Sequence, residues 1–150
     1  MLVWRICRET HQALDGEGSR LHGGRWNSER VSVVYTSSTL ALAALEYLVH
    51  VDIEDVPDDL VAMAIEVPDD GGEGIVAVDD LPPDWNQVLD HPACARIGDQ
   101  WAAKGTVLLL RVPSAVVPEE SNVLINPDHP RAGDVRMVSI RPFAFDSRLV

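Results

Sequence analysis

The stretch that most constrains the fold of this chain is residues 23–50, GGRWNSERVSVVYTSSTLALAALEYLVH. Residues 31–36 are apolar and β-branched, which predicts a strand. Either of the two serines that follow can cap a helix, and residues 40–49 are apolar on nearly every side, which predicts a buried helix. Glu46 is the only charged residue of that run. Because burying an unpaired carboxylate costs several kcal/mol, we expect Glu46 to be paired, protonated or functional.

The whole chain has the composition of one globular domain, with 150 residues, 46% of them hydrophobic and 24% charged. Its pattern predicts a single α+β domain over residues 1–150, with a central mixed β-sheet core of six or seven strands and two main helices. The second helix is expected at 92–103, with Gly105 as its stop. Further strands are expected at 2–7, 60–67, 75–78, 106–112, within 118–130, and at 135–140.

Residues 13–27, ALDGEGSRLHGGRWN, hold four glycines and no apolar periodicity. This composition predicts a loop whose backbone can approach a ligand closely. It is not a dinucleotide-fold fingerprint, because no predicted strand runs directly into it and no predicted helix opens from it. Arg25 follows Gly24, so N–H groups and a guanidinium could together hold a pyrophosphate, although Arg25 could equally pair with an acid. Arg5, inside the first predicted strand, either lies at an exposed edge or points into a polar cleft.

The net charge of −12 argues against a nucleic-acid-binding surface, which normally needs a basic face. Residues 1–30 nevertheless hold five arginines against four acids, and eleven of the twelve basic residues are arginine. Arginine pairs bidentately with phosphate or carboxylate, so this distribution favours a small anionic ligand. An arginine-rich genome would give the same bias.

No stretch reaches the roughly 18 apolar residues of a membrane span, and the first residues do not resemble a signal peptide. Cys7 and Cys94 lie far apart, and we interpret them as reduced, buried thiols of a cytoplasmic protein. The five histidines lack the paired spacing of a zinc site, so no metal is expected. A serine-hydrolase elbow is also absent. Ser121 precedes Asn122 at a strand start, where a hydroxyl serves as a turn cap more often than as a ligand.

Three stretches together, ALDGEGSRLHGGRWN, VVYTSSTLALAALEYLVH and VPSAVVPEESNVLINPDHP, closely resemble the RES-domain family. This family comprises the toxins of RES–Xre toxin–antitoxin pairs, and the resemblance covers essentially the whole chain. The arginine, glutamate and serine of the family map onto Arg25, Glu46 and Ser121, and Tyr35 matches the family's tyrosine. A glycine that the family carries shortly after GGRWN is missing here.

The resemblance implies an ADP-ribosyltransferase-like fold that binds NAD⁺ as a substrate and breaks its nicotinamide–ribose bond. Members deplete cellular NAD⁺ by hydrolysis or phosphorolysis. Two alternatives stay open, a mono-ADP-ribosyltransferase that modifies a protein and a non-catalytic module that binds an antitoxin. The implied partner is a cognate Xre-type antitoxin, which blocks the active site and itself binds DNA. A homodimer within the toxin–antitoxin complex is expected, with no prosthetic group.

The implied catalytic residues suit this chemistry, which develops an oxocarbenium-like ribose and a neutral leaving group. The ring of Tyr35 would face the cationic nicotinamide, worth up to about 2 kcal/mol. Glu46 would place negative charge near the developing cation or hold a ribose hydroxyl. Ser121 would hydrogen-bond the nicotinamide amide or the ribose. The residues expected to hold NAD⁺ are Arg5, Gly24, Arg25, Tyr35 and Asn122.

Overall fold

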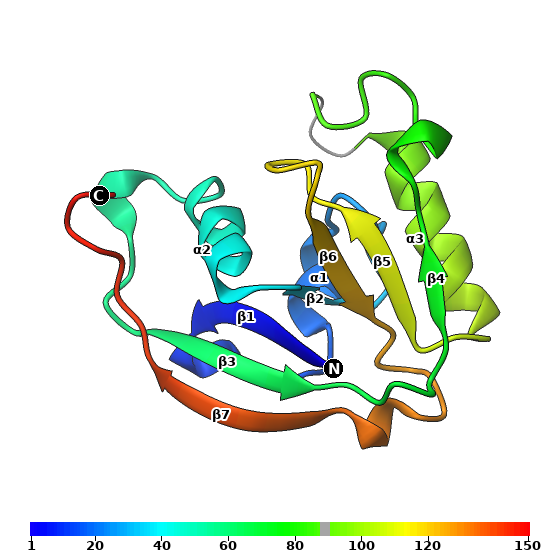
Figure 1. Ribbon diagram of the computed structural model, residues 1–150, viewed down its shortest axis with the longest axis horizontal. Coiled ribbons are helices and arrows are strands. Elements are labelled where there is room, and N and C mark those ends of the chain that lie inside the picture. Colours follow the sequence, from blue (N-terminus) through cyan, green and yellow to red (C-terminus); the bar gives the residue numbers. More distant parts are fainter. Residues whose placement is uncertain (88–90) are drawn as a thin grey trace.

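Seven strands form one sheet in the computed structural model, which describes residues 1–87 and 91–150. Their order is β4-β5-β6-β2-β1-β3-β7 (Figure 1). The β4–β5 pair is parallel and the other five pairs are antiparallel, so the sheet is mixed and the α+β prediction is confirmed. The strands are β1 (Leu2–Arg8), β2 (Val34–Ser37), β3 (Leu60–Glu66), β4 (Glu73–Ile75), β5 (Leu109–Pro113), β6 (Ser121–Ile125) and β7 (Arg136–Pro142).

The α-helices of the described residues are α1 (Glu17–His22), α2 (Leu40–Leu48) and α3 (Pro92–Lys104). Helix α3 ends at Gly105 in the left-handed conformation, as expected. The prediction of an uninterrupted loop over 13–27 is wrong, because α1 lies inside it. Helix α2 is capped by Thr39, whose Oγ1 accepts from the backbone N–H of Leu42 at 3.1 Å, and not by a serine. Short 3₁₀ turns occupy Glu9–His11, Ile53–Asp55, Val78–Asp80 and Ala132–Asp134.

Strand β2 starts later than the apolar pattern predicts, at Val34. The backbone of Val33 is bound by a side chain instead of a strand: the Ser19 hydroxyl donates to its carbonyl at 2.6 Å and accepts from its N–H at 2.9 Å. The Val33 side chain is buried in an apolar cluster that includes Cys94 and Trp101 of α3. The apolar side chain therefore marks burial there, while α1 supplies the backbone partners.

The junction between β1 and β2 is the narrowest in the sheet. Trp4 and Ser37 are the one pair in register between these strands, whereas β1 and β3 share seven pairs and β2 and β6 share four. The half-sheets β4-β5-β6-β2 and β1-β3-β7 therefore meet at a short joint and diverge beyond it (Figure 1). This divergence makes room for a pocket at the joint.

Three apolar clusters hold the two half-sheets and the helices together. One lies on the sheet and joins both halves through residues such as Val3, Met63 and Val123. A second packs α3 and the Trp26–Trp85 ring pair against β5 and β6. The third lies under α2 and is formed by Ile6, Ala43, Leu60 and Ala62, with Tyr47, Phe143 and Phe145 packed against it.

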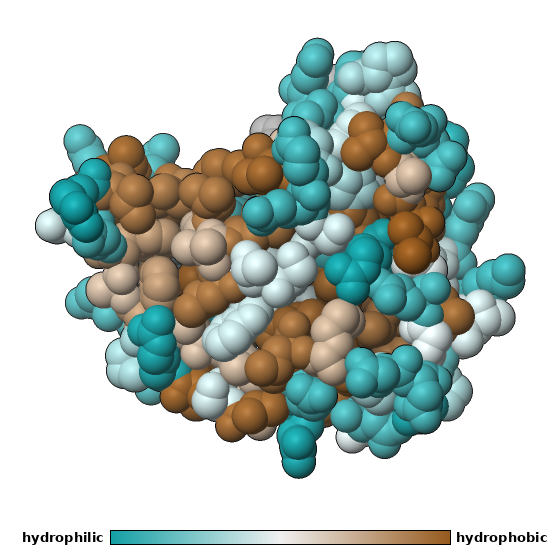
Figure 2. All heavy atoms as spheres, in the orientation of Figure 1, coloured by the Kyte–Doolittle hydropathy of each residue, from teal (hydrophilic) through white to brown (hydrophobic). Residues whose placement is uncertain are grey.

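Helix α2 departs from the prediction that it is buried all round. Of its residues only Leu42 and Ala43 are fully buried, whereas Leu45 is 41% exposed and Val49, its C-cap, is 55% exposed. The helix packs on β1 and β2 with one side and leaves the other open. Figure 2 shows apolar surface gathered at the upper left of the molecule, over α2 and the segment that follows it.

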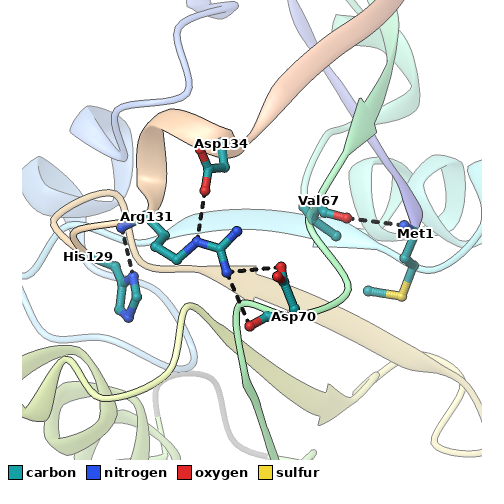
Figure 3. A network of polar contacts seen from close by, with 6 residues as sticks. All are labelled: Met1, Val67, Asp70, His129, Arg131 and Asp134. Atoms are coloured by element: carbon teal, nitrogen blue, oxygen red, sulfur yellow. Dashed lines mark hydrogen bonds and ion pairs between the residues drawn. The ribbon is translucent and has the colours of Figure 1, made fainter.

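A polar network fastens the loop after β6 to the turn after β3 (Figure 3). The Arg131 guanidinium donates to the Asp70 carboxylate at 2.9 Å and to the Asp70 carbonyl at 3.1 Å, while its Nε donates to Asp134 at 2.8 Å. Close by, the Met1 amino group donates to the Val67 carbonyl at 3.1 Å. None of these residues lines the pocket described below, so the network serves the fold.

Cys7 and Cys94 are both buried free thiols, as predicted, and burial raises the pKa of each above its ordinary value. Within residues 1–87 and 91–150, no helix is long and apolar enough to cross a membrane.

Candidate active site

A pocket of about 380 Å³ lies at the joint between β1 and β2. Its walls come from β1, α1, the turn at 23–26, β2, α2 and the start of β6. Elements that are far apart in the sequence therefore contribute to one cavity. The predicted site residues that line it are Arg5, Gly24, Arg25, Tyr35, Glu46 and Asn122. Ser121 is the one predicted site residue that is not part of this lining.

Arg25 is presented by a tight turn that Asn27 holds in shape. The Gly24 N–H donates to the Asn27 carbonyl at 3.0 Å, which closes the turn. The Asn27 side chain is 2% exposed, and its Nδ2 donates to three backbone carbonyls, those of Ser19, Ser28 and Val31, at 2.9 to 3.1 Å. A side chain held by three backbone groups fixes the turn on α1 and on the segment before β2.

Tyr35 is joined to the same turn through its hydroxyl. That hydroxyl donates to Asn27 Oδ1 at 2.6 Å and accepts from the Trp26 N–H at 3.0 Å. A Cβ on Gly24 would lie 2.7 Å from the Tyr35 hydroxyl, which is closer than real side chains approach. Glycine is therefore needed at position 24 because the tyrosine hydroxyl passes directly over its backbone.

The two arginines of the pocket are bound to backbone carbonyls. Arg25 Nη1 donates to the Trp85 carbonyl at 2.8 Å, and Trp85 in turn packs against Trp26, with ring centroids 6.2 Å apart. Arg5 Nη1 donates to the Ala13 carbonyl at 3.3 Å. Of the two possibilities for Arg5, the structure therefore shows the polar cleft and not an exposed edge.

Glu46 is half-buried and receives two short hydrogen bonds from neutral donors. Ser114 Oγ and Asn122 Nδ2 each donate to its Oε1 at 2.6 Å. Asn122 Oδ1 accepts from Ser37 Oγ at 2.7 Å, which fixes the amide with its nitrogen toward the carboxylate. Among the described residues, the hydrogen bonds to Glu46 end on Oε1, and this leaves Oε2 for a ligand. The expectation of a fully buried glutamate is corrected to a partly buried, paired one.

Ser114, which donates to Glu46 but is not part of the pocket lining, is one of the residues that sequence reasoning missed. It is fully buried immediately after β5, and its hydroxyl also accepts from the N–H groups of Val116 and Val117 at 3.1 Å each. The available signal was its place in VPSAVVP, inside a stretch that resembles the family. The hydrogen bond that Ser121 forms here comes from its backbone: its carbonyl accepts from the Ser38 N–H at 3.2 Å.

The wall of the pocket that α2 provides holds further residues that sequence reasoning missed, beside the predicted Glu46. Ala43, Glu46, Tyr47 and His50 follow one face of a helix, at i, i+3, i+4 and i+7, and all four line the pocket together with Trp4 of β1. Burial raises the pKa of the Tyr47 hydroxyl above its ordinary value. The helical periodicity of these positions was the signal that could have identified them.

Histidine, cysteine and acidic side chains do not gather in groups of three or more that could hold a metal ion within residues 1–87 and 91–150. The chemistry available in the pocket is that of one carboxylate, two tyrosines, two arginines, an imidazole, an amide, hydroxyls and indole rings. Such a set can neutralise an anionic ligand at one point and stabilise positive charge at another.

The fold and the pocket define an α+β protein whose split sheet holds a cleft lined by aromatic, charged and hydroxyl side chains at the joint of its two half-sheets. A family model described as the RES domain matches residues 2–146, and the chain belongs to the RES domain family. The resemblance found in the sequence is thereby confirmed.

Relatives of known name cover nearly the full chain. The "Prs ADP-ribosylating toxin" of Sphingobium sp. (strain YBL2) is 37% identical over 153 residues, which covers 98% of this chain and 95% of the relative. "Toxin Res" of Photorhabdus laumondii subsp. laumondii is 35% identical over 156 residues, covering 100% and 97%.

Among solved structures, a chain of the M. tuberculosis MbcT–MbcA toxin–antitoxin complex superposes with a TM-score of 0.79. The match covers 95% of this chain and 84% of that chain, at 17% identity. At this identity the similarity concerns the fold, and it agrees with the seven-stranded mixed sheet described above.

Proposed function

We propose that this chain is the toxin of a toxin–antitoxin pair and that it breaks the nicotinamide–ribose bond of NAD⁺. The observation that carries the proposal is the Glu46 carboxylate, held by Ser114 and Asn122 in the pocket that Arg25 and Tyr35 also line. The names of the relatives, which include an ADP-ribosylating toxin, support the same reading. We also propose that residues 1–150 form one RES domain.

The pocket suits NAD⁺ by the chemistry of its residues. The pyrophosphate carries negative charge, which the Arg25 and Arg5 guanidinium groups would neutralise. The nicotinamide ring is cationic, so the face of Tyr35 is a favourable neighbour, worth up to about 2 kcal/mol when water is excluded. Asn122, already bound to Glu46, would contribute to holding the ribose side of the ligand.

Glu46 would act where positive charge develops on the ribose as the bond to nicotinamide breaks. Ser114 and Asn122 are neutral donors, so they fix the position of the carboxylate without neutralising it. A carboxylate that is already in place need not reorganise during the reaction, which is the condition for effective electrostatic stabilisation. Its Oε2 would hold a ribose hydroxyl or orient the acceptor.

The acceptor decides which of two activities follows. Water or phosphate would give NAD⁺ depletion, by hydrolysis or phosphorolysis. A protein side chain would give mono-ADP-ribosylation, and the name of the Sphingobium relative favours this second candidate. Both begin with the same bond cleavage, so the same pocket residues serve either one.

The test is to incubate the purified chain with NAD⁺, with and without phosphate, and to follow nicotinamide by chromatography beside Glu46→Gln. Release by the wild type alone would support the enzyme, and dependence on phosphate would identify the acceptor. If nicotinamide is released only in a lysate, labelled NAD⁺ should show a modified protein band. If neither release nor labelling occurs with folded protein, the proposal fails and a non-catalytic antitoxin-binding module becomes the better interpretation.

For the biological setting, we propose a cytoplasmic protein controlled by an Xre-type antitoxin that blocks the pocket, with a toxin homodimer inside the complex. The toxin–antitoxin complex among the solved structures of similar fold supports a partner of this kind. A toxic activity must be held back during growth, so the wild type should express poorly alone. Expression should recover with Glu46→Gln or with the antitoxin. Equal expression of wild type and variant would count against toxicity.

A further inference from the structure

The outward side of α2 lacks the polar residues that a surface helix normally presents. Ala41, Leu45 and Val49 are exposed and recur every four positions, which places them in one stripe along the helix. Ile53, in the turn that follows, extends the stripe and is 59% exposed. We call these four residues the α2 stripe. Figure 2 shows the apolar surface in this region.

Acidic residues border one end of the α2 stripe. Leu48, Val51 and Ile53 line a shallow hollow together with Asp52, Glu54 and Asp55. These three acids are exposed, and no described residue forms an ion pair with any of them. A contiguous apolar surface with a charged border is typical of a protein-binding site.

We propose that the α2 stripe is the docking surface for an amphipathic helix of a partner protein, with apolar residues on one side and lysine or arginine at its border. Basic residues would complement Asp52, Glu54 and Asp55. A second copy of this chain is a poor occupant, because two molecules of net charge −12 repel each other.

The position of the stripe connects docking to the pocket. The opposite face of the same helix carries Glu46 and Tyr47, and His50 follows shortly after the helix; all three line the cavity. A partner seated on the stripe therefore touches the element that positions the carboxylate. The proposal rests on the proposed function only in taking this partner to be the antitoxin, and the binding test below does not depend on any activity toward NAD⁺.

The test uses two fluorescent helical peptides of about 18 residues, one of leucine and lysine in heptads and one with glutamate in place of lysine. Binding to the chain is followed by anisotropy. The lysine peptide should bind, and the glutamate peptide should bind at least about ten-fold more weakly. Leu45→Gln/Val49→Gln should weaken binding of the lysine peptide by about ten-fold or more. Ile75→Gln, which replaces a 71% exposed residue of β4, is the matched control and should leave binding unchanged.

The acidic border is tested separately. Asp52→Asn/Glu54→Gln/Asp55→Asn should weaken the binding of the lysine peptide and remove most of the salt dependence of that binding. Asp79→Asn/Asp80→Asn, in another acidic turn, should leave both unchanged. The replaced groups are exposed, so circular dichroism should show an unchanged fold. The proposal would be overturned if the lysine peptide did not bind, or if neither the apolar nor the acidic substitutions changed its affinity. A wild-type dimer seen by light scattering that Leu45→Gln/Val49→Gln dissociates would also overturn it, because a second copy would then cover the stripe.

Discussion

The Tyr35 hydroxyl donates a 2.6 Å hydrogen bond to Asn27 Oδ1, and this contact locks β2 to the turn that carries Arg25. Asn27 uses its nitrogen on three carbonyls of the surrounding backbone, so its oxygen is free to receive the tyrosine. The same hydroxyl accepts from the Trp26 N–H. The Tyr35 side chain thus fixes its own ring in the pocket and, at the same time, the two residues that follow Arg25.

Tyr35→Phe should therefore lower stability as well as change the pocket. It leaves the Trp26 N–H and Asn27 Oδ1 without this partner, a loss of about 1–3 kcal/mol that corresponds to a melting temperature lower by roughly 2–10 °C. Tyr47→Phe is the matched control, since no described residue hydrogen-bonds the Tyr47 hydroxyl. Thermal unfolding of the two variants measures the difference. Equal melting temperatures would show that the Tyr35 hydroxyl does not hold the turn.

The contributions of Ser114 and Ser121 to catalysis can be distinguished by measuring the activity of their alanine variants. Ser114→Ala removes a charge-assisted hydrogen bond to Glu46, so we expect NAD⁺ cleavage to fall by roughly ten-fold or more. Neither serine belongs to the pocket lining, but the Ser121 side chain forms no hydrogen bond to Glu46 among the described residues, so Ser121→Ala should change the rate by less than about two-fold. Nicotinamide release gives the rate, and thermal unfolding of the same samples shows whether the fold is kept. A larger loss for Ser121→Ala would restore the assignment made from the sequence.

The sheet was largely predictable because its strands carry local signals. Strand β3 is apolar on both faces, and α3 is followed by a glycine at a left-handed position, so both follow from neighbouring residues alone. Helix α1 carries no such signal, since EGSRLH has no apolar periodicity. It is held by a tertiary contact, the Ser19 hydroxyl on the backbone of Val33. No pattern within residues 13–27 contains that information.

The residues of the candidate site that match the family's motif in order along the sequence could be predicted. Arg25, Tyr35 and Glu46 lie in one stretch of the sequence, and the structure brings them to one pocket. Ser114 is 68 residues from Glu46, and its role depends on β5, β6 and β2 lying side by side in the sheet. The exposure of α2 was equally hidden, because apolar residues indicate that a helix face needs a partner without saying whether the partner belongs to the same chain.

Gly98 should be among the least replaceable glycines of the chain. A Cβ at this position would lie 1.6 Å from the Trp26 carbonyl oxygen, so α3 and the turn that carries Arg25 would have to separate. Gly98→Ala should cost at least about 1–3 kcal/mol, because backbone atoms cannot rotate away as side chains do. Gly133→Ala is the matched control, with nothing within 4 Å of the added Cβ. Chemical denaturation of both variants decides the matter, and similar midpoints would contradict the close packing.

The ion pair of Arg8 and Asp59 should make part of the stability depend on pH. Arg8 Nε donates to Asp59 Oδ1 at 3.0 Å and Nη2 donates to Oδ2 at 3.1 Å, and these bonds hold the pKa of the Asp59 carboxyl below its ordinary value. In the unfolded chain the pKa of this carboxyl is about 3.9. The contribution is therefore complete above that pH and is lost as the pH falls through the lower pKa of the folded state.

Melting temperatures of the wild type and Asp59→Asn should accordingly differ most near neutral pH and converge in acid, below about pH 4. Asp58→Asn changes the neighbouring exposed carboxylate and serves as the matched control, with no comparable convergence. The Arg8 side chain is 53% exposed and that of Asp59 is 26% exposed, so water reaches the pair and added salt should narrow the neutral-pH difference. A difference that stays constant or widens on acidification would mean that the carboxylate is not ionised in its contact with Arg8, because only the charged form gains from the guanidinium.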